Sequence, residues 1–171
     1  QLKREGVEGD ATTVETAIRT CGRAEQWEHA LNLLARISEF AVEKTLFAFN
    51  AAIGACENAA EWTQALTLLV QLQEENLQGD VFTHSAVISA CGQGHQWQVT
   101  FPLLKQLEDS SLEADVVTLS SAVGACAPAM HWEAAVALLA HALSRQLTGD
   151  VITFAFLNLS LQVVGNVRNL L

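Results

Sequence analysis

The sequence predicts an all-α solenoid built from stacked helix-turn-helix hairpins of 35 residues, and three observations support this. The cysteines are spaced 35 residues apart and so are the tryptophans (Cys21, Cys56, Cys91, Cys126; Trp27, Trp62, Trp97, Trp132). Apolar residues recur twice in each period at helical spacing, and the chain has only two prolines. Repeats of this length form solenoids because one hairpin cannot bury its own apolar face.

The first half of each period predicts one helix. An Asp closes most periods (Asp10, Asp80, Asp115, Asp150, with Thr45 in the remaining position), and we count places from the residue after it. Apolar or small residues occupy places 4, 7, 8 and 11, as in Phe49, Ala52, Ile53 and Cys56, which is the stripe of an amphipathic helix. We expect the threonine at place 3, such as Thr83, to cap this helix with its side-chain oxygen.

The second half of each period predicts a second helix that begins at the tryptophan. Its apolar stripe in one period is Trp62, Ala65, Leu66, Leu69 and Leu72. The third period carries Pro102 inside this helix, where proline removes a backbone donor, so we expect a kink or a delayed start there. Short breaks such as Gly92 to Gly94 are expected between the two helices.

The period divides the chain into repeats of a single solenoid domain. Residues 1–10 correspond to the tail of a preceding repeat, because Gln1 and Leu2 align with Gln71 and Leu72. Full repeats follow at 11–45, 46–80, 81–115 and 116–150, and residues 151–171 begin another. We therefore expect the sequence to be part of a longer solenoid.

The repeats resemble the pentatricopeptide repeat family over essentially the whole chain. They follow V-x-T-x-(N/S)-x-x-I-x-A-C-x-x-x-x-x-W-x-x-A-L-x-L-L and close on Asp, whereas tetratricopeptide repeats carry a Tyr that this chain lacks. They depart from the family at place 34, usually Pro, where Lys44, Gly79, Ala114 and Gly149 stand. The resemblance implies a right-handed superhelix that binds single-stranded RNA in a chloroplast or mitochondrion, one base per repeat.

The resemblance also implies which residues contact RNA. Places 5 and 35 select the base, so Asn50 with Asp80 would prefer uracil, while Glu15 with Thr45 matches no familiar pair. Two further pairs would prefer guanine, which gives a UGG preference for residues 46–150 (Ser85 with Asp115, Ser120 with Asp150). The residues at place 2 would flank the bases, namely Phe47, Phe82, Val117 and Ile152. The phosphate contact at place 13 would be Arg23. From residue types alone, place 5 is a small exposed helix residue and the Asp a turn former.

The charge of the chain opposes RNA binding. The sequence has 9 Lys and Arg against 19 Asp and Glu, for a net charge of −10, and no basic residue lies between Lys44 and Lys105. Nucleic-acid affinity depends largely on cations that meet phosphates. The alternative is a non-catalytic scaffold subunit of a large organellar assembly, such as a ribosome or a membrane complex, whose acidic surface attracts a basic protein (Glu57, Glu61, Glu74, Glu75, Glu108, Glu113).

Catalytic and metal sites are not indicated. Cysteines at the same place of successive helices should stand about 8–10 Å apart, too far for a disulfide or a zinc site, so we expect buried packing residues. The five histidines have no ligand spacing, and no nucleophile–base set or phosphate-binding glycine loop occurs. No apolar run approaches the roughly 20 residues of a membrane span. We predict a binding protein with no enzyme activity, cofactor or small-molecule substrate.

Overall fold

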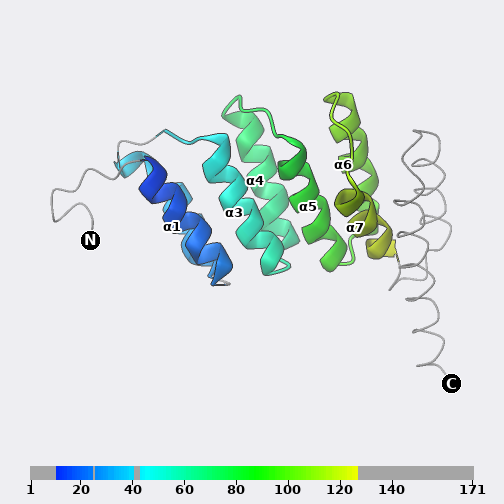
Figure 1. Ribbon diagram of the computed structural model, residues 1–171, viewed down its shortest axis with the longest axis horizontal. Coiled ribbons are helices and arrows are strands. Elements are labelled where there is room, and N and C mark those ends of the chain that lie inside the picture. Colours follow the sequence, from blue (N-terminus) through cyan, green and yellow to red (C-terminus); the bar gives the residue numbers. More distant parts are fainter. Residues whose placement is uncertain (1–10, 25, 41–42, 127–171) are drawn as a thin grey trace, which may run out of the picture. The chain divides into compact units, whose positions relative to one another are not determined.

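The computed structural model describes residues 11–24, 26–40 and 43–126, which form helices and turns and contain no strand (Figure 1). The predicted all-α class is confirmed for this part of the chain. The chain divides between Thr83 and His84 into two compact units, and each is described on its own. Ser120 lies inside the described residues, whereas Asp150 and Ile152 lie outside them.

The first unit contains two helical hairpins and the first turn of the next helix. Helix α1 packs along α3, and each of them also packs against the second helix of its own hairpin, as Figure 1 shows for α1 and α3. A short 3₁₀ helix, η2, follows α2. The bounds are α1 Ala11–Arg23, α2 Trp27–Ala35, η2 Ile37–Phe40, α3 Leu46–Asn58 and α4 Trp62–Glu74, and α5 begins at Val81.

In the part of the second unit that the structure describes, the rest of α5 is followed by helices α6 and α7. Helix α7 packs against α6. The bounds are α5 Val81–Gln93, α6 Trp97–Asp109 and α7 Val116–Cys126. The first helices α1, α3, α5 and α7 thus begin 35 residues apart, and each described second helix begins at a tryptophan. No helix in the described ranges is long and apolar enough to cross a membrane.

The predicted apolar stripes supply most of the core residues, but on α4 Trp62 and Leu66 are only half-buried, whereas Leu68, outside the predicted stripe, is buried. Phe49, Ala52, Ile53 and Cys56 on α3 are all buried. The cysteine thiols of α3, α5 and α7 are free and buried, and burial raises the pKa of Cys56 to about 12, with the charge of Glu61 adding to the effect. Burial likewise raises the pKa values of Cys91 and Cys126 to about 11. These thiols therefore stay protonated near neutral pH, and the predicted packing role is confirmed for them.

The helix caps differ from the prediction. Helix α5 begins directly after Asp80, whose Oδ1 accepts a hydrogen bond from the backbone N–H of Thr83 at 2.8 Å. Asp115 caps the Thr118 N–H in the same way at 2.8 Å. At the equivalent position before α3, Thr45 Oγ1 accepts from the N–H of Ala48 at 3.1 Å. The predicted caps at Thr83 and Thr118 are wrong because both threonines lie in the first turn of their helices, and the residue at place 35 caps α3, α5 and α7 instead.

Helix α6 also differs from the prediction. It begins at Trp97 and continues through Pro102 to Asp109, so the predicted delay is wrong. Proline at this position removes the hydrogen bond to the carbonyl of Gln98 and no other. Gln98 and Pro102 are both exposed, so water can satisfy that carbonyl and the helix continues.

Two glycines allow neighbouring first helices to approach closely. A Cβ on Gly22 of α1 would lie 2.9 Å from the Cβ of Ala55 on α3, and a Cβ on Gly92 of α5 would lie 2.7 Å from the backbone oxygen of Ser121 on α7. The expected break at Gly92 is wrong, because α5 continues to Gln93. Gly92 is required for helix packing and not for a turn.

Candidate nucleic-acid interface

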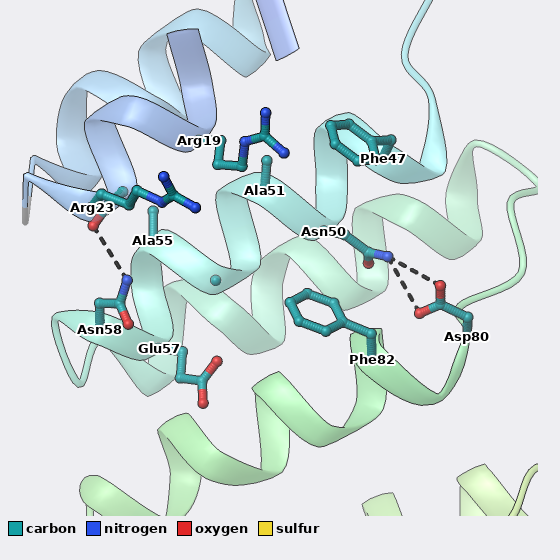
Figure 2. Close-up of a pocket in the computed structure, with 12 residues that line it drawn as sticks. Arg19, Arg23, Phe47, Asn50, Ala51, Ala55, Glu57, Asn58, Asp80 and Phe82 are labelled. Atoms are coloured by element: carbon teal, nitrogen blue, oxygen red, sulfur yellow. Dashed lines mark hydrogen bonds between the residues drawn. The ribbon is translucent and has the colours of Figure 1, made fainter. Parts of the chain in front are cut away.

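A pocket of about 520 Å³ opens in the first unit between α1, α3 and the first turn of α5 (Figure 2). Phe47 and Phe82 line this pocket. Both rings are large and apolar, yet Phe47 is 48% exposed and Phe82 is 54% exposed. Phe47 and Asn50 lie three residues apart on α3 and so share one helix face. The pocket brings together the five residues that the family resemblance assigns to RNA contact here (Arg23, Phe47, Asn50, Asp80 and Phe82), and also Glu57 of the predicted acidic surface.

The polar edge of the pocket is a network of three side chains. Asn50 Nδ2 donates to both carboxylate oxygens of Asp80 at 3.2 Å, as Figure 2 shows. The hydroxyl of Thr83 lies 2.8 Å from Asp80 Oδ1 and 2.7 Å from Asn50 Oδ1, and it accepts from the backbone N–H of Asp80 at 3.1 Å. The cap of α5 is therefore also the partner of the side chain at place 5.

The network determines the charge of Asp80. Partial burial alone would raise the pKa of this carboxyl, but the hydrogen bonds from the N–H and hydroxyl of Thr83 and from Asn50 outweigh it and lower the pKa below its ordinary value. Asp80 is thus an anion at neutral pH, and it presents hydrogen-bond acceptors to the pocket.

Two arginines of α1 lie at the opposite side of the pocket. Arg19 and Arg23 are four residues apart and share a helix face, and the guanidinium carbon of Arg19 stands 5.6 Å from the centroid of the Phe47 ring. Glu57 also lines this pocket and opposes their charge. Of the other predicted acidic residues, Glu75 forms an ion pair with Lys44 at 2.6 Å.

The second unit contains a comparable network without the amide. The hydroxyl of Ser85 is hydrogen-bonded to that of Thr118, and Thr118 Oγ1 donates to Asp115 Oδ1 at 2.7 Å. Val117, next to Thr118 in the sequence, is 59% exposed. Phe47 and Phe82 are likewise exposed in the first unit. Ser120 lies on α7 and is half-buried.

The first repeat has another pair at the same places. Thr45 Oγ1 donates to Glu15 Oε1 at 2.5 Å, and Ala48 stands at place 3 of the next helix. This pair exposes only a carboxylate and a hydroxyl that already has two partners. Place 2 of this repeat is the exposed Thr12, which offers no ring.

Sequence reasoning missed two residues of the site. Arg19 was not singled out, although its spacing of four from Arg23 places both on one helix face. Thr83 was interpreted as a helix cap, because a threonine near a helix start is a common cap and the sequence does not show which neighbour its hydroxyl meets. In the described ranges, no group of three or more His, Cys, Asp or Glu is placed to hold a metal ion.

Comparison of the sequence with protein-family models finds no match, and comparison with curated proteins finds none either. The structure, however, is similar to crystal structures of the pentatricopeptide repeat protein PPR10. One, from maize, has a TM-score of 0.77 at 14% identity and matches 98% of this chain and 25% of that chain. Another, in complex with an 18-nt psaJ RNA element, has a TM-score of 0.73 at 22% identity and matches 98% and 26%.

These comparisons show that the chain has a pentatricopeptide-repeat-like fold, as predicted. The chain spans about a quarter of the length of the PPR10 chains that it matches.

Proposed function

We propose that the chain binds single-stranded RNA as a pentatricopeptide-type helical-repeat protein, without catalysis. The observation that carries the proposal is the pocket between the exposed rings of Phe47 and Phe82, with the Asn50–Asp80 pair at its edge. The family resemblance supports a chloroplast or mitochondrial setting and repeat boundaries at 45/46, 80/81 and 115/116. A protein of the same fold, PPR10, has been crystallised in complex with an 18-nt RNA element.

The two phenylalanines are suited to hold a base by its faces. A large exposed apolar ring is costly unless it meets another flat surface, and stacking of a base on an aromatic side chain contributes roughly 1–3 kcal/mol. Phe47 and Phe82 are exposed on the same pocket, which gives a base one ring on each side. Stacking of this kind holds any base, so the rings provide affinity and not sequence preference.

The Asn50–Asp80 pair is suited to select the base. After its bonds to Asp80, the amide of Asn50 retains a second N–H, and the carboxylate retains lone pairs. Uracil presents an N3–H donor between two carbonyl acceptors, so it complements one donor and one carboxylate. We propose guanine at the pairs Ser85 with Asp115 and Ser120 with Asp150, which gives a UGG preference for residues 46–150.

The phosphate contacts are few. Arg23 and Arg19 are the basic side chains of the pocket, and Glu57, which lines the same pocket, weakens its attraction for an anion. Two cation–phosphate contacts on single-stranded RNA give a slope of log affinity against log salt of about −1.4. We expect weak binding, near the roughly 10⁻⁴ M end of non-specific affinities, that tightens at low salt.

Fluorescence anisotropy with labelled RNA tests this function. At low salt, RNA that contains UGG should bind more tightly than a scrambled RNA of the same composition, and Phe82→Ala should weaken binding by at least about fivefold through lost stacking. Val70→Ala is the matched control, because Val70 is a 53% exposed apolar residue on α4 that does not line the pocket. Equal binding of the two RNAs, or equal effects of the two variants, would reject the proposal.

A second candidate function is docking of a basic protein in a large organellar assembly. It is favoured by exposed carboxylates at and just beyond the ends of α4 and α6, namely Glu74, Glu75, Asp109 and Glu113. Such residues would attract a cationic surface. The double change Glu74→Lys with Glu75→Lys should then reduce incorporation into the host complex, measured by sedimentation, whereas Gln at both positions should reduce it less. Unchanged incorporation would argue against docking there.

A further inference from the structure

We propose that Thr83 is a positioning residue that orients the amide of Asn50 and thereby sets the preference for uracil over cytosine at this pocket. The proposal rests on the RNA-binding function proposed above. Thr83 is fully buried and does not itself line the pocket. Its hydroxyl oxygen lies 2.7 Å from Asn50 Oδ1 and 2.8 Å from Asp80 Oδ1, so it contacts both residues of the base-selecting pair.

The orientation of the amide follows from the donors and acceptors around it. A carboxylate only accepts hydrogen bonds, so the amide atom that faces Asp80 must be Nδ2, at 3.2 Å from both carboxylate oxygens. Oδ1 of Asn50 then faces Thr83, whose hydroxyl accepts the N–H of Asp80 and shares its single hydrogen between Asn50 Oδ1 and Asp80 Oδ1. A flipped amide would place its oxygen against the carboxylate. The amide is therefore held from both ends.

The held amide determines what the base meets. Asp80 offers an acceptor and Asn50 a donor, in fixed positions. Uracil carries a hydrogen on N3, which can donate to the carboxylate, whereas cytosine has a lone pair on N3 that the carboxylate repels. Without the hydroxyl of Thr83, Oδ1 of Asn50 loses its donor while Nδ2 stays bound to Asp80, so this oxygen becomes available to accept from the amino group of cytosine. The preference for uracil over cytosine should then become smaller.

The second unit supports a general role for the threonine at place 3. Thr118 contacts Ser85 and Asp115 as Thr83 contacts Asn50 and Asp80, although the residue at place 5 differs. In each case the threonine is fully buried and its backbone N–H is bound by the Asp. A hydroxyl in this position therefore joins places 5 and 35 in both units.

The direct test compares the binding of UGG and CGG RNAs to the whole chain and its variants. The wild type should prefer UGG, and Thr83→Val, which keeps the shape but loses the hydroxyl, should lower the UGG/CGG affinity ratio by about fivefold, as expected for one neutral hydrogen bond. Thr83→Ser should restore the ratio. Thr118→Val, at the neighbouring base-selecting pair, is the matched control: it should change the affinities for both RNAs by the same factor and leave the UGG/CGG ratio unchanged. An unchanged ratio in Thr83→Val would overturn the proposal, since a purely structural loss weakens both RNAs equally.

A measurement without RNA separates this proposal from the function on which it rests. In NMR spectra, Thr83→Val should raise the pKa of the Asp80 carboxyl and shift the side-chain amide signals of Asn50, because both lose a contact with the hydroxyl. Thr83→Ser should do neither. If the wild type binds no RNA but these shifts occur, the function fails and the positioning role stands. If Asn50 and Asp80 do not respond, the positioning role is wrong.

Discussion

The networks at places 5 and 35 of the two units differ in how far the side chain at place 5 reaches. Asn50 extends to Asp80 and bonds it directly, whereas the shorter Ser85 contacts Thr118, which in turn bonds Asp115. Asp80 is half-buried and Asp115 is exposed. The threonine and the capping Asp keep the same arrangement in both units, so the residue at place 5 can change without loss of the helix start.

The largest expected difference between the units concerns the glycines between first helices. Gly92→Ala should destabilise the second unit by about 3 kcal/mol, because the new methyl group meets backbone that cannot rotate away. Gly22→Ala should cost somewhat less, about 2 kcal/mol, because its methyl group would lie 2.9 Å from the Cβ and 3.1 Å from the Cα of Ala55, atoms that are also rigid but lie slightly farther away than the 2.7 Å contact at Gly92. Urea denaturation measures both, and hydrogen exchange should locate the faster amides in α7 for Gly92→Ala. Equal losses would contradict this difference.

The second largest difference concerns the capping carboxylates, whose removal should destabilise the two units by different amounts. Asp80→Ala removes a cap and leaves the buried hydroxyl of Thr83 and the amide of Asn50 with fewer partners, so it should lower the free energy of unfolding by about 2 kcal/mol. Asp115→Ala removes an exposed cap and should cost about 1 kcal/mol. Thermal unfolding followed by circular dichroism measures the two. A larger loss for Asp115→Ala would show that the direct bond to Asn50 adds no stability.

The turns after helices α3, α4 and α6 should respond more weakly and in the opposite direction. Ala60, after α3, and Ser111, after α6, have φ values of 56° and 60°, a left-handed conformation that favours glycine. Ala60→Gly and Ser111→Gly should each raise the free energy of unfolding by about 1 kcal/mol. Asn76→Gly, at φ 58°, is the control and should gain less because Asn tolerates this conformation. A loss of stability in Ala60→Gly would contradict the assigned turn.

The smallest expected effect is the pH dependence of the Asp80 network. Hydrogen bonds lower the pKa of Asp80 in the folded chain, so its stabilising contribution is complete above the ordinary pKa of about 4 and is lost as the pH falls through the folded value. Asp80→Asn lacks this titration. The stability difference between wild type and Asp80→Asn should therefore shrink below about pH 4, in urea denaturation at several pH values. A difference that stays constant would mean that the pKa of Asp80 is not lowered.

Most of the fold could be predicted from the 35-residue period and the apolar stripes of the sequence. Identical spacing of Cys56, Cys91 and the tryptophans predicts the start of each second helix at the residue where the structure has it, because bulk is needed where two helices meet. The positions of caps and close contacts could not be predicted in the same way. Asp80 and Thr83 are both good caps, and Gly92 serves equally in a turn or between helices, so only the three-dimensional structure distinguishes these roles.

The candidate site was predicted in part. The family resemblance singled out Phe47, Asn50, Asp80, Phe82 and Arg23, and the structure gathers them at one pocket. Thr83 could not be found this way, because a buried hydroxyl acts through its neighbours and leaves no pattern of its own in the sequence. Glu57 was predicted only as part of an acidic surface, since a sequence does not show which helix face meets a groove.

The pocket in Figure 2 takes its walls from successive helices: arginines from α1, Phe47 and Asn50 from α3, and Asp80 with Phe82 at the start of α5, while the buried Thr83 contacts Asn50 and Asp80 without lining it. A protein engineer who exchanged residues 46–80 as a cassette would thus carry over the selecting pair and one aromatic wall, but leave the opposite wall and the orienting hydroxyl behind. Transplants that are cut inside the helices, after residue 83 instead of residue 80, would move these parts together.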